Sequence, residues 1–214
     1  MEDDTCQRLL DAAETLFAEH GFADTSLRAI TAQAEANLAA VHYHFGSKDE
    51  LVRAVFARRL KALNEERLAQ LTALETGGGL VTVEAVLTAF IGPSLRLRRA
   101  GLQGERFTRL LGRAQIEAPE GLRVFLRDQY APVLERFQRT LVQTLPGLSP
   151  AEIRWRLYFT LGALSFTYAG SPWPRLPLAV RETGDEAWLQ GQLVRFLTAG
   201  LRAPPLEEKA GEAA

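Results

Sequence analysis

Cysteine is nearly absent from this chain of 214 residues, in which Cys6 is the single occurrence. One cysteine cannot form an intrachain disulfide, and no partner residue stands at metal-ligand spacing from it. The histidines are His20, His42 and His44, and positions two apart on a helix point about 200° apart, so His42 and His44 do not form a ligand pair. We therefore expect no disulfide, no metal and no cofactor.

Long apolar runs are also missing. No stretch of about 18 consecutive apolar residues occurs, and no signal-peptide pattern is present. We therefore expect a soluble cytoplasmic protein with no membrane partner. No run of alternating apolar and polar residues is long enough to predict a strand. Hydrophobic residues nevertheless make up 47% of the chain, enough for a sizeable core, and their spacing predicts an all-α fold.

Catalytic patterns are the third absence. The sequence contains no serine elbow, no phosphate-binding glycine loop and no metal-ligand spacing, which disfavours an enzyme. Two other classes stay open at this point: a regulator that binds nucleic acid and a helical module that docks protein. A gel shift with upstream DNA would separate these two classes.

The sequence does contain closely spaced helix starts between residues 25 and 51. Ser26, Asn37 and Ser47 each carry a side-chain oxygen that can accept a hydrogen bond from the first amides of a helix. Apolar residues follow the first two caps at three- and four-residue spacing, as a buried helix face requires. Only a three-residue turn, 35–37, fits between the two short helices, so they must cross steeply. This pattern predicts a helix-turn-helix and therefore DNA binding.

The second short helix presents an outward face of small residues and hydrogen-bonding rings, at Ala39, Ala40, His42, Tyr43 and His44. Alanine lets a helix enter the major groove, and a histidine or tyrosine can reach a base edge or a phosphate oxygen. A lysine in the first turn of the next helix is disfavoured by the helix dipole unless an anion approaches. The alternative interpretation is a small packing unit with solvated aromatic rings.

A series of spaced motifs runs from about Leu9 to Ala57: Ala12-Ala13, Leu16-Phe17, Gly21-Phe22, Thr25-Ser26, Ile30, Ala34, Tyr43-His44-Phe45 and Lys48-Asp49-Glu50-Leu51. This series resembles the DNA-binding domain of the TetR family of transcriptional regulators. The resemblance implies that the helix from Leu38 to His44 enters the major groove of double-stranded operator DNA. The implied DNA-binding residues are Thr25, Ser26, Arg28, Leu38, Ala39, Ala40, His42, Tyr43, His44 and Lys48.

The sequence departs from the family pattern at two positions. Glu35 stands where glycine is commonest, and a left-handed backbone there would cost a non-glycine residue roughly 1 kcal/mol. His42 lies at a position of variable chemistry, so the operator sequence cannot be transferred from relatives.

Charge argues against a broadly basic DNA-binding surface. Residues 1–60 carry six basic and ten acidic side chains, a net charge of −4, so phosphate contacts must be local and few counterions would be released. Residues 96–139 carry ten arginines against five acids, a net charge of +5. This region is either a solvated surface or a receptor for an anionic small molecule.

Periodic apolar residues predict further helices after the helix-turn-helix, and Gly92-Pro93 predicts a kink in one of them. The expected helices are 48–74, 82–100, 104–118, about 120–145, 149–169 and one from Asp185. We expect a helix-turn-helix domain at 1–47, a connecting helix at 48–76, a ligand-binding and dimerisation domain at 77–202 and a disordered tail at 203–214.

The C-terminal helices carry side chains that suit an acyl chain or an aromatic ring, with arginines for a carboxylate or a coenzyme A phosphate. The candidate ligand-binding residues are Phe90, Leu97, Phe107, Leu111, Phe125 and Phe137. Each of these could instead be an ordinary core residue. Residues 38–41, 107–113 and 155–163 resemble the PsrA-like branch of the family, which implies a response to long-chain fatty acids and control of lipid degradation. Regulation of aromatic-acid catabolism or drug efflux is the alternative.

The helix at 149–169 is apolar on most of its circumference, so several sides must be covered. An intramolecular core and a dimer interface both fit this pattern, and the TetR resemblance implies a homodimer through the last two helices. The candidate dimerisation residues are Trp155, Phe159, Gly162, Phe166, Trp188 and Phe196. The sequence as a whole predicts a dimeric repressor that binds a palindromic operator and is released by a hydrophobic acidic effector, a fatty acid or an acyl-CoA.

Overall fold

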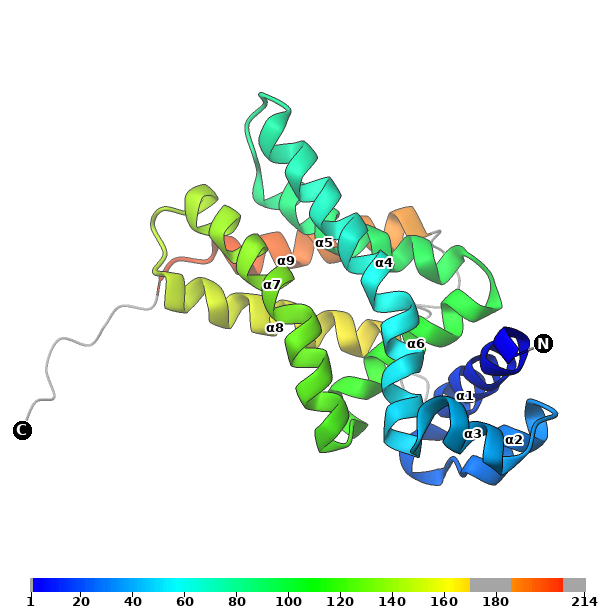
Figure 1. The fold of residues 1–214 in the computed structure, drawn as a ribbon. Coiled ribbons are helices and arrows are strands. Elements are labelled where there is room, and N and C mark those ends of the chain that lie inside the picture. The colour runs from blue at the N-terminus through cyan, green and yellow to red at the C-terminus, as the bar shows by residue number, and fades with distance from the viewer. Residues whose placement is uncertain (1, 170–185, 206–214) are drawn as a thin grey trace, which may run out of the picture.

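The computed structural model describes residues 2–169 and 186–205. Within these ranges the chain forms nine α-helices and no strand, which confirms the all-α prediction (Figure 1). The helices are α1 (Glu2–Asp24), α2 (Leu27–Gln33), α3 (Leu38–Phe45), α4 (Lys48–Thr76), α5 (Val83–Arg99), α6 (Leu102–Glu117), α7 (Glu120–Thr144), α8 (Pro150–Ala169) and α9 (Glu186–Arg202).

The three predicted caps are present at the starts of α2, α3 and α4. The Ser26 Oγ accepts from the amide of Ala29 at 3.1 Å, and the Asn37 Oδ1 accepts from the amide of Ala40 at 2.8 Å. The Ser47 Oγ accepts from the amide three residues on at 3.1 Å. Each cap satisfies an amide that has no partner inside its own helix, so the local sequence sets where these helices begin.

The longer helices agree with the predicted ranges within two residues at each end. Helix α6 begins at Leu102 because Gly101, with φ of 101°, ends the preceding turn. Helix α5 continues through Pro93 as one helix, and the kink that Gly92-Pro93 predicts stays a prediction. The predicted loop 171–184, the start at Asp185 and the tail from 206 lie outside the described residues.

Two hydrophobic clusters form the core. The first contains the inner faces of α1 to α3, the N-terminal half of α4, α6 and the start of α7. The second contains α5, the C-terminal half of α7, α8 and α9. Within the first cluster, the ring centroids of Phe22 and Phe56 lie 6.2 Å apart, and those of Phe56 and Phe107 lie 5.8 Å apart. The core of the helix-turn-helix therefore continues into α6.

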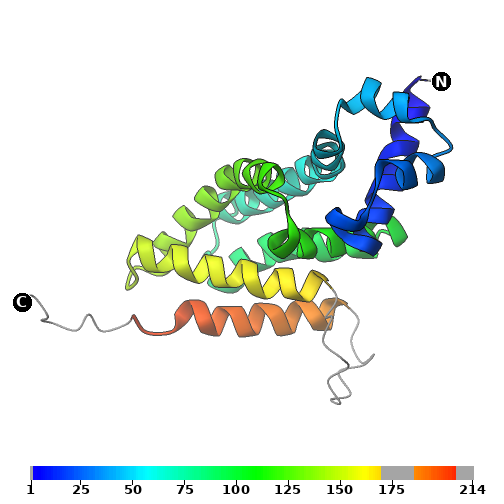
Figure 2. The ribbon, with the colours of Figure 1, turned by 90° about the horizontal axis from the view of Figure 1, so that it is seen from below.

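Helices α8 and α9 run antiparallel, side by side, along the edge of the molecule opposite α1 to α3 (Figure 2). One face of this pair packs on the rest of the chain, and the other carries exposed aromatic side chains. In the described part of the chain, no helix combines the length and apolar character needed to cross a bilayer.

Candidate DNA interface and ligand cavity

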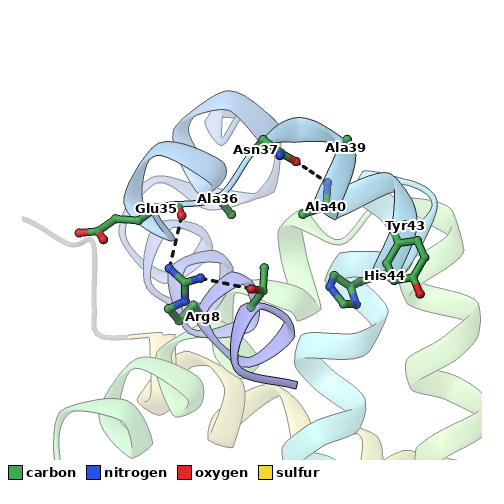
Figure 3. A pocket seen from close by; sticks show the side chains of 9 residues that line it. Arg8, Glu35, Ala36, Asn37, Ala39, Ala40, Tyr43 and His44 are labelled. Atoms are coloured by element: carbon green, nitrogen blue, oxygen red, sulfur yellow. Dashed lines mark hydrogen bonds between the residues drawn. The ribbon is translucent and has the colours of Figure 1, made fainter. Parts of the chain in front are cut away.

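An open groove of about 780 Å³ lies between the outer face of α3 and the start of α1 (Figure 3). Its lining residues are Thr5, Arg8, Glu35, Ala36, Asn37, Ala39, Ala40, Tyr43 and His44. On the opposite face of α3, Val41 is fully buried. The small residues and rings named from the sequence thus face outward together, as an insertion into a DNA groove requires.

Most of the expected DNA-binding side chains are accessible. Tyr43 is 73% exposed, and its ring meets the ring of His44 edge-on at 5.1 Å. Ser26, Arg28, Leu38, Ala39 and His42 are exposed, while Ala40, His44 and Lys48 are half-buried. These residues, apart from Ser26 and Arg28 on α2 and Lys48 on α4, all lie on α3.

His42 has a defined hydrogen-bonding state. Its Nδ1 lies 2.9 Å from the carbonyl oxygen of Gly46. A carbonyl only accepts, so Nδ1 carries a proton and donates it. In the neutral ring Nε2 is then an acceptor, which can receive a hydrogen bond from the amino group of adenine or cytosine.

Thr25 and Lys48 make hydrogen bonds within the chain, and their expected phosphate contacts stay a prediction. Thr25 is 2% exposed, and its Oγ1 donates to the carbonyl of Gly21 at 2.7 Å. The Lys48 Nζ donates to the carbonyl of Phe22 at 2.6 Å. Because Gly21 leaves the helical conformation with φ of 87°, carbonyls near the end of α1 need such partners. Both side chains therefore hold the end of α1 against the start of α2 and α4.

Arg8 is a residue of the groove that sequence reasoning missed. Its Nη1 donates to the carbonyls of Ala34 at 2.9 Å and Glu35 at 3.3 Å, directly at the turn between α2 and α3. Glu35 has φ of 49°, the left-handed conformation considered for this position from the sequence. The sequence did offer a sign that Arg8 could contact an anion, because Arg8 is the one arginine or lysine among the first 27 residues.

A second cavity, of about 390 Å³, lies among α4, α5, α6, α7 and α8. Its lining residues are Arg67, Phe90, Leu111, Ala114, Gln115, Arg123, Leu126, Arg127, Tyr130, Leu134, Tyr158, Leu161, Leu164, Ser165 and Tyr168. Phe90 and Leu111 belong to the expected ligand-binding set. The cavity falls within the size range of small-molecule sites and is lined mainly by apolar side chains.

The other four expected ligand-binding residues lie outside this cavity. Leu97, Phe107 and Phe125 pack in the first hydrophobic cluster. Phe137 packs in the second and meets the Phe90 ring edge-on at 5.1 Å. Their apolar character serves the core, as the alternative interpretation of these residues held.

The cavity also contains polar groups that were not named from the sequence. Arg67 is 2% exposed, and its Nε donates to the carbonyl of Phe90 at 3.0 Å. Its Nη1 and Nη2 donate to Asn64 Oδ1 at 3.0 Å and to Ser94 Oγ at 2.6 Å. The sequence indicates this buried position of Arg67 too, because Arg67 follows the buried Leu60 and Leu63 at helical spacing, on the same face of α4.

Helix α6 joins the cavity to the helix-turn-helix. Leu111 and Ala114 line the cavity, while Arg113 donates to the carbonyls of Ala18 at 3.2 Å and Glu19 at 3.3 Å on α1. The Arg106 Nη2 also lies 3.4 Å from the Glu19 Oε1. One helix thus touches both sites through neighbouring residues.

The expected dimerisation residues lie together on the uncovered side of α8 and α9. All six are exposed: Trp155, Phe159, Gly162, Phe166, Trp188 and Phe196. The Trp155 ring meets the Tyr158 ring edge-on at 5.9 Å and lies 6.1 Å from the Phe159 ring. Exposed aromatic clusters of this kind are typical of protein interaction surfaces.

Two curated relatives match short parts of this chain. The nicotine-responsive transcriptional repressor HdnoR of Paenarthrobacter nicotinovorans is 45% identical over 60 residues, which are 28% of this chain and 31% of the relative. The transcriptional repressor Rv3405c of Mycobacterium tuberculosis is 47% identical over 53 residues, 25% of this chain and 28% of the relative. The matches thus span less than a third of the relatives' length.

Solved structures match nearly the whole chain at low identity. The fatty acid degradation regulator FadR from Bacillus halodurans has a TM-score of 0.59 and 17% identity, covering 92% of this chain and 96% of that one. A tetR-family bacterial regulatory protein from Rhodococcus RHA1 has a TM-score of 0.63 and 17% identity, with the same coverage of 92% and 96%. These similarities show the shared fold.

Two family matches cover the two parts of the fold. Residues 9–55 match the bacterial regulatory proteins of the tetR family, and residues 88–200 match the tetracyclin repressor-like C-terminal domain. The second match alone covers more than half of the chain. With its N-terminal helix-turn-helix and its C-terminal helical domain, the chain belongs to the TetR family of bacterial regulatory proteins.

Proposed function

We propose that this chain is a cytoplasmic transcriptional repressor that binds a palindromic operator as a homodimer and leaves it when a hydrophobic acidic effector occupies the C-terminal cavity. The observation that carries this proposal is the asymmetry of α3. Its inner face is buried through Val41, while Tyr43 and His44 stand outward beside an open groove. A helix needed for packing alone has no use for such a face.

DNA recognition would combine a few base contacts with local phosphate contacts. Ala39 and Ala40 leave room for close approach to the major groove, and the Nε2 of His42 is available to a base edge. The backbone N–H groups in the first turns of α2 and α3, and the side chains of Arg8 and Arg28, would donate hydrogen bonds to phosphates. With so few basic residues, we expect a shallow dependence of affinity on salt concentration.

Dimerisation would proceed through α8 and α9. Their exposed aromatic side chains and the small residue Gly162 allow a second copy to pack closely as a four-helix bundle. A twofold dimer presents two copies of α3 to the DNA. Half-sites about 34–36 Å apart, one turn of the double helix, would then be read together.

Release would depend on the elements shared by the cavity and the reading domain. Arg67, which lines the cavity, lies on α4, and α4 begins at its cap Ser47, next to the end of α3. At a rise of 1.5 Å per residue, Arg67 and Ser47 lie about 30 Å apart along this helix. Helix α6 provides the second connection through Leu111 and Arg113. Displacement of either helix by a ligand would change the separation of the two reading helices, and a few ångströms suffice to lose the match to DNA.

The apolar walls and nearby arginines of the cavity support a fatty acid or an acyl-CoA as the effector. Three short patches resembling the PsrA-like branch point the same way, and the Bacillus halodurans structural neighbour is a regulator of fatty acid degradation. The nicotine response of HdnoR is not carried over, because that match covers 28% of this chain.

Fluorescence anisotropy with DNA from directly upstream of the gene for this chain tests the proposal. We expect binding that survives an excess of random competitor DNA and weakens when decanoate, hexadecanoate or palmitoyl-CoA is added. Equal affinity for upstream and random DNA would contradict a repressor and favour a protein-docking module. Unchanged operator affinity with every fatty acid, acyl-CoA and aromatic acid tried would contradict the effector class.

A further inference from the structure

The strongest unexplained feature of the molecule is the positive charge of Arg67 at the cavity wall. The guanidinium is almost completely buried, and its three hydrogen-bond partners, the Phe90 carbonyl, Asn64 Oδ1 and Ser94 Oγ, are all neutral. In the part of the chain that the structure describes, no carboxylate forms an ion pair with it. Buried charges are ordinarily paired, so this arrangement lacks a counter-charge.

The guanidinium also has unused hydrogen-bonding capacity at the cavity wall. Arginine has five N–H groups, and three of those on Arg67 are engaged. The Phe90 ring lies 4.4 Å and the Tyr130 ring 5.7 Å from its central carbon, and both rings line the same cavity. Three hydrogen bonds and two rings therefore hold the guanidinium in one orientation, as a preformed receptor for an anion requires.

Tyr168 supplies a second, independent donor at the same cavity. This side chain is 8% exposed, and its hydroxyl makes no hydrogen bond of regular geometry with the described residues, although the Ser94 hydroxyl lies close to it. Burial raises the pKa of this hydroxyl above its usual value of 10, while the interaction with the Ser94 hydroxyl and the charge of Arg67 act to lower it. The hydroxyl therefore keeps its proton at neutral pH and can donate a hydrogen bond to an anion.

The remaining walls are apolar and limit the size of the ligand body. They are formed mainly by Leu111, Ala114, Leu126, Leu134, Leu161 and Leu164 around a volume of about 390 Å³. This volume is near the lower end of the range for small-molecule sites. The two arginines Arg123 and Arg127 are largely exposed and already pair with Glu120 and Asp128, so neither replaces the buried receptor.

We infer that the effector is a free carboxylic acid with an apolar body, whose carboxylate is bound by Arg67 and Tyr168, and that its coenzyme A thioester is not an effector. Thioester formation removes the carboxylate, leaving a neutral carbonyl that cannot balance the charge of Arg67. This inference rests on the proposed function, since it names the chemical class of the ligand for the same cavity. It narrows the earlier choice between a fatty acid and an acyl-CoA.

Calorimetric titration of the full chain with three matched probes, decanoate, decanol and decanoyl-CoA, tests the inference. We expect decanoate to bind at least tenfold more tightly than either of the others. Octanoate, hexadecanoate and 4-phenylbutyrate serve as further free acids, so that body size does not decide the outcome. Equal binding of decanoate and decanol, tighter binding of decanoyl-CoA, or no binding by any of the acids would overturn the inference.

Two variants test whether Arg67 and Tyr168 bind the carboxylate. Arg67→Met keeps an unbranched apolar stem but removes the charge, and should remove the preference for decanoate over decanol while retaining decanol binding. Tyr168→Phe removes only the hydroxyl and should weaken decanoate binding several-fold, which keeps the test decisive if Arg67→Met does not fold. Arg109→Met, which replaces an arginine that does not line the cavity and pairs with Glu105 on its own helix, is the matched control and should leave the preference unchanged. An undiminished preference in Tyr168→Phe, or a loss in Arg109→Met equal to that in Arg67→Met, would overturn the assignment.

Separate measurement of operator binding distinguishes this inference from the proposed function. Tight binding of decanoate with no effect on DNA affinity would contradict ligand-controlled repression and leave the carboxylate receptor standing. Specific DNA binding released by decanoyl-CoA and not by free acids would support the repressor and overturn the inferred ligand class.

Discussion

The Nη1 of Arg113 on α6 donates a hydrogen bond to the carbonyl oxygen of Ala18 on α1 at 3.2 Å. This carbonyl lies in the last regular turn of α1 before Gly21 breaks the helix. The bond therefore ties the end of α1 to a helix on which Leu111, two residues earlier, borders the cavity. It is a direct connection between the cavity and the helix-turn-helix.

Replacing this arginine should weaken the communication between the two sites. We expect Arg113→Met to bind the effector as the unaltered chain does, and to lose about 0.5–2 kcal/mol of the coupling between effector and operator. Operator affinity measured with and without ligand gives this coupling. Arg109→Met is the control, because Arg109 pairs with Glu105 on its own helix. Equal coupling losses in the two variants would argue against a specific role of the Arg113 bond.

The position of α3 in the DNA groove has its own test. The double variant Ala40→Glu, His44→Ala should weaken operator binding by about 2 kcal/mol or more, since it adds a negative charge and removes a donor on the reading face. Its mass in solution should remain that of a dimer. Ala62→Glu, which changes charge equally at an exposed site on α4, should retain DNA affinity. Preserved affinity in the double variant would refute the placement of α3.

The proposed dimer would depend on exposed aromatic side chains of α8 and α9, on the opposite side of the molecule from α3. Phe196 on α9 is 72% exposed in the single chain. If this face is covered by a second copy, Phe196→Glu should weaken the dimer by about 2–4 kcal/mol, the range of a central interface residue. Analytical ultracentrifugation over a concentration series measures the change. Leu80→Glu, also at an exposed apolar residue but in the loop between α4 and α5, should leave the dimer intact.

Glu35 has a left-handed backbone conformation and also places a negative charge in the groove. Two substitutions separate the effect of the conformation from that of the charge. Glu35→Gly should raise the free energy of unfolding by about 1 kcal/mol, because glycine adopts a φ of 49° without a steric penalty. Glu35→Gln keeps the strain and should leave stability unchanged. Both remove the charge and should strengthen DNA binding to a similar degree. A stability gain in the glutamine variant would assign the cost to charge rather than to strain.

Features set by neighbouring residues in the sequence could be predicted. The caps at Ser26, Asn37 and Ser47 depend on amides two or three residues away, so their identity is sufficient to place three helix starts. The uncommon conformation at Glu35 is local in the same way. The apolar circumference of the helix at 149–169 fits both an internal core and a dimer interface, so the aromatics of α8 and α9 were assigned to a dimer only through the TetR resemblance.

The cavity could not be predicted from the sequence to the same extent. In the sequence, Phe90 and Phe137 are both apolar residues of a helix, and their rings pack against each other in the structure. Of the two, Phe90 alone borders the cavity, because the packing of α5 against α7 decides which ring faces it. The spacing of Arg67 from Leu60 and Leu63 indicates a buried position, but its partners on α5 follow only from how α4 and α5 pack. Thr25 and Lys48 show the converse case, because contacts with the end of α1 occupy groups that the sequence suggested were available to DNA.

Gly112 on α6 has a consequence for the proposed dimer. A Cβ at this position would lie 2.2 Å from the amide nitrogen of Ala169 and 2.6 Å from the carbonyl oxygen of Ser165, so α6 touches the backbone of α8 with no space between them. Three consecutive residues of α6 thus face the cavity, the proposed dimer helix and the reading domain. In a dimer, movement of α6 in one subunit would reach the shared α8 surface and then the other cavity. We expect the two effector sites to bind cooperatively, with a Hill coefficient different from one.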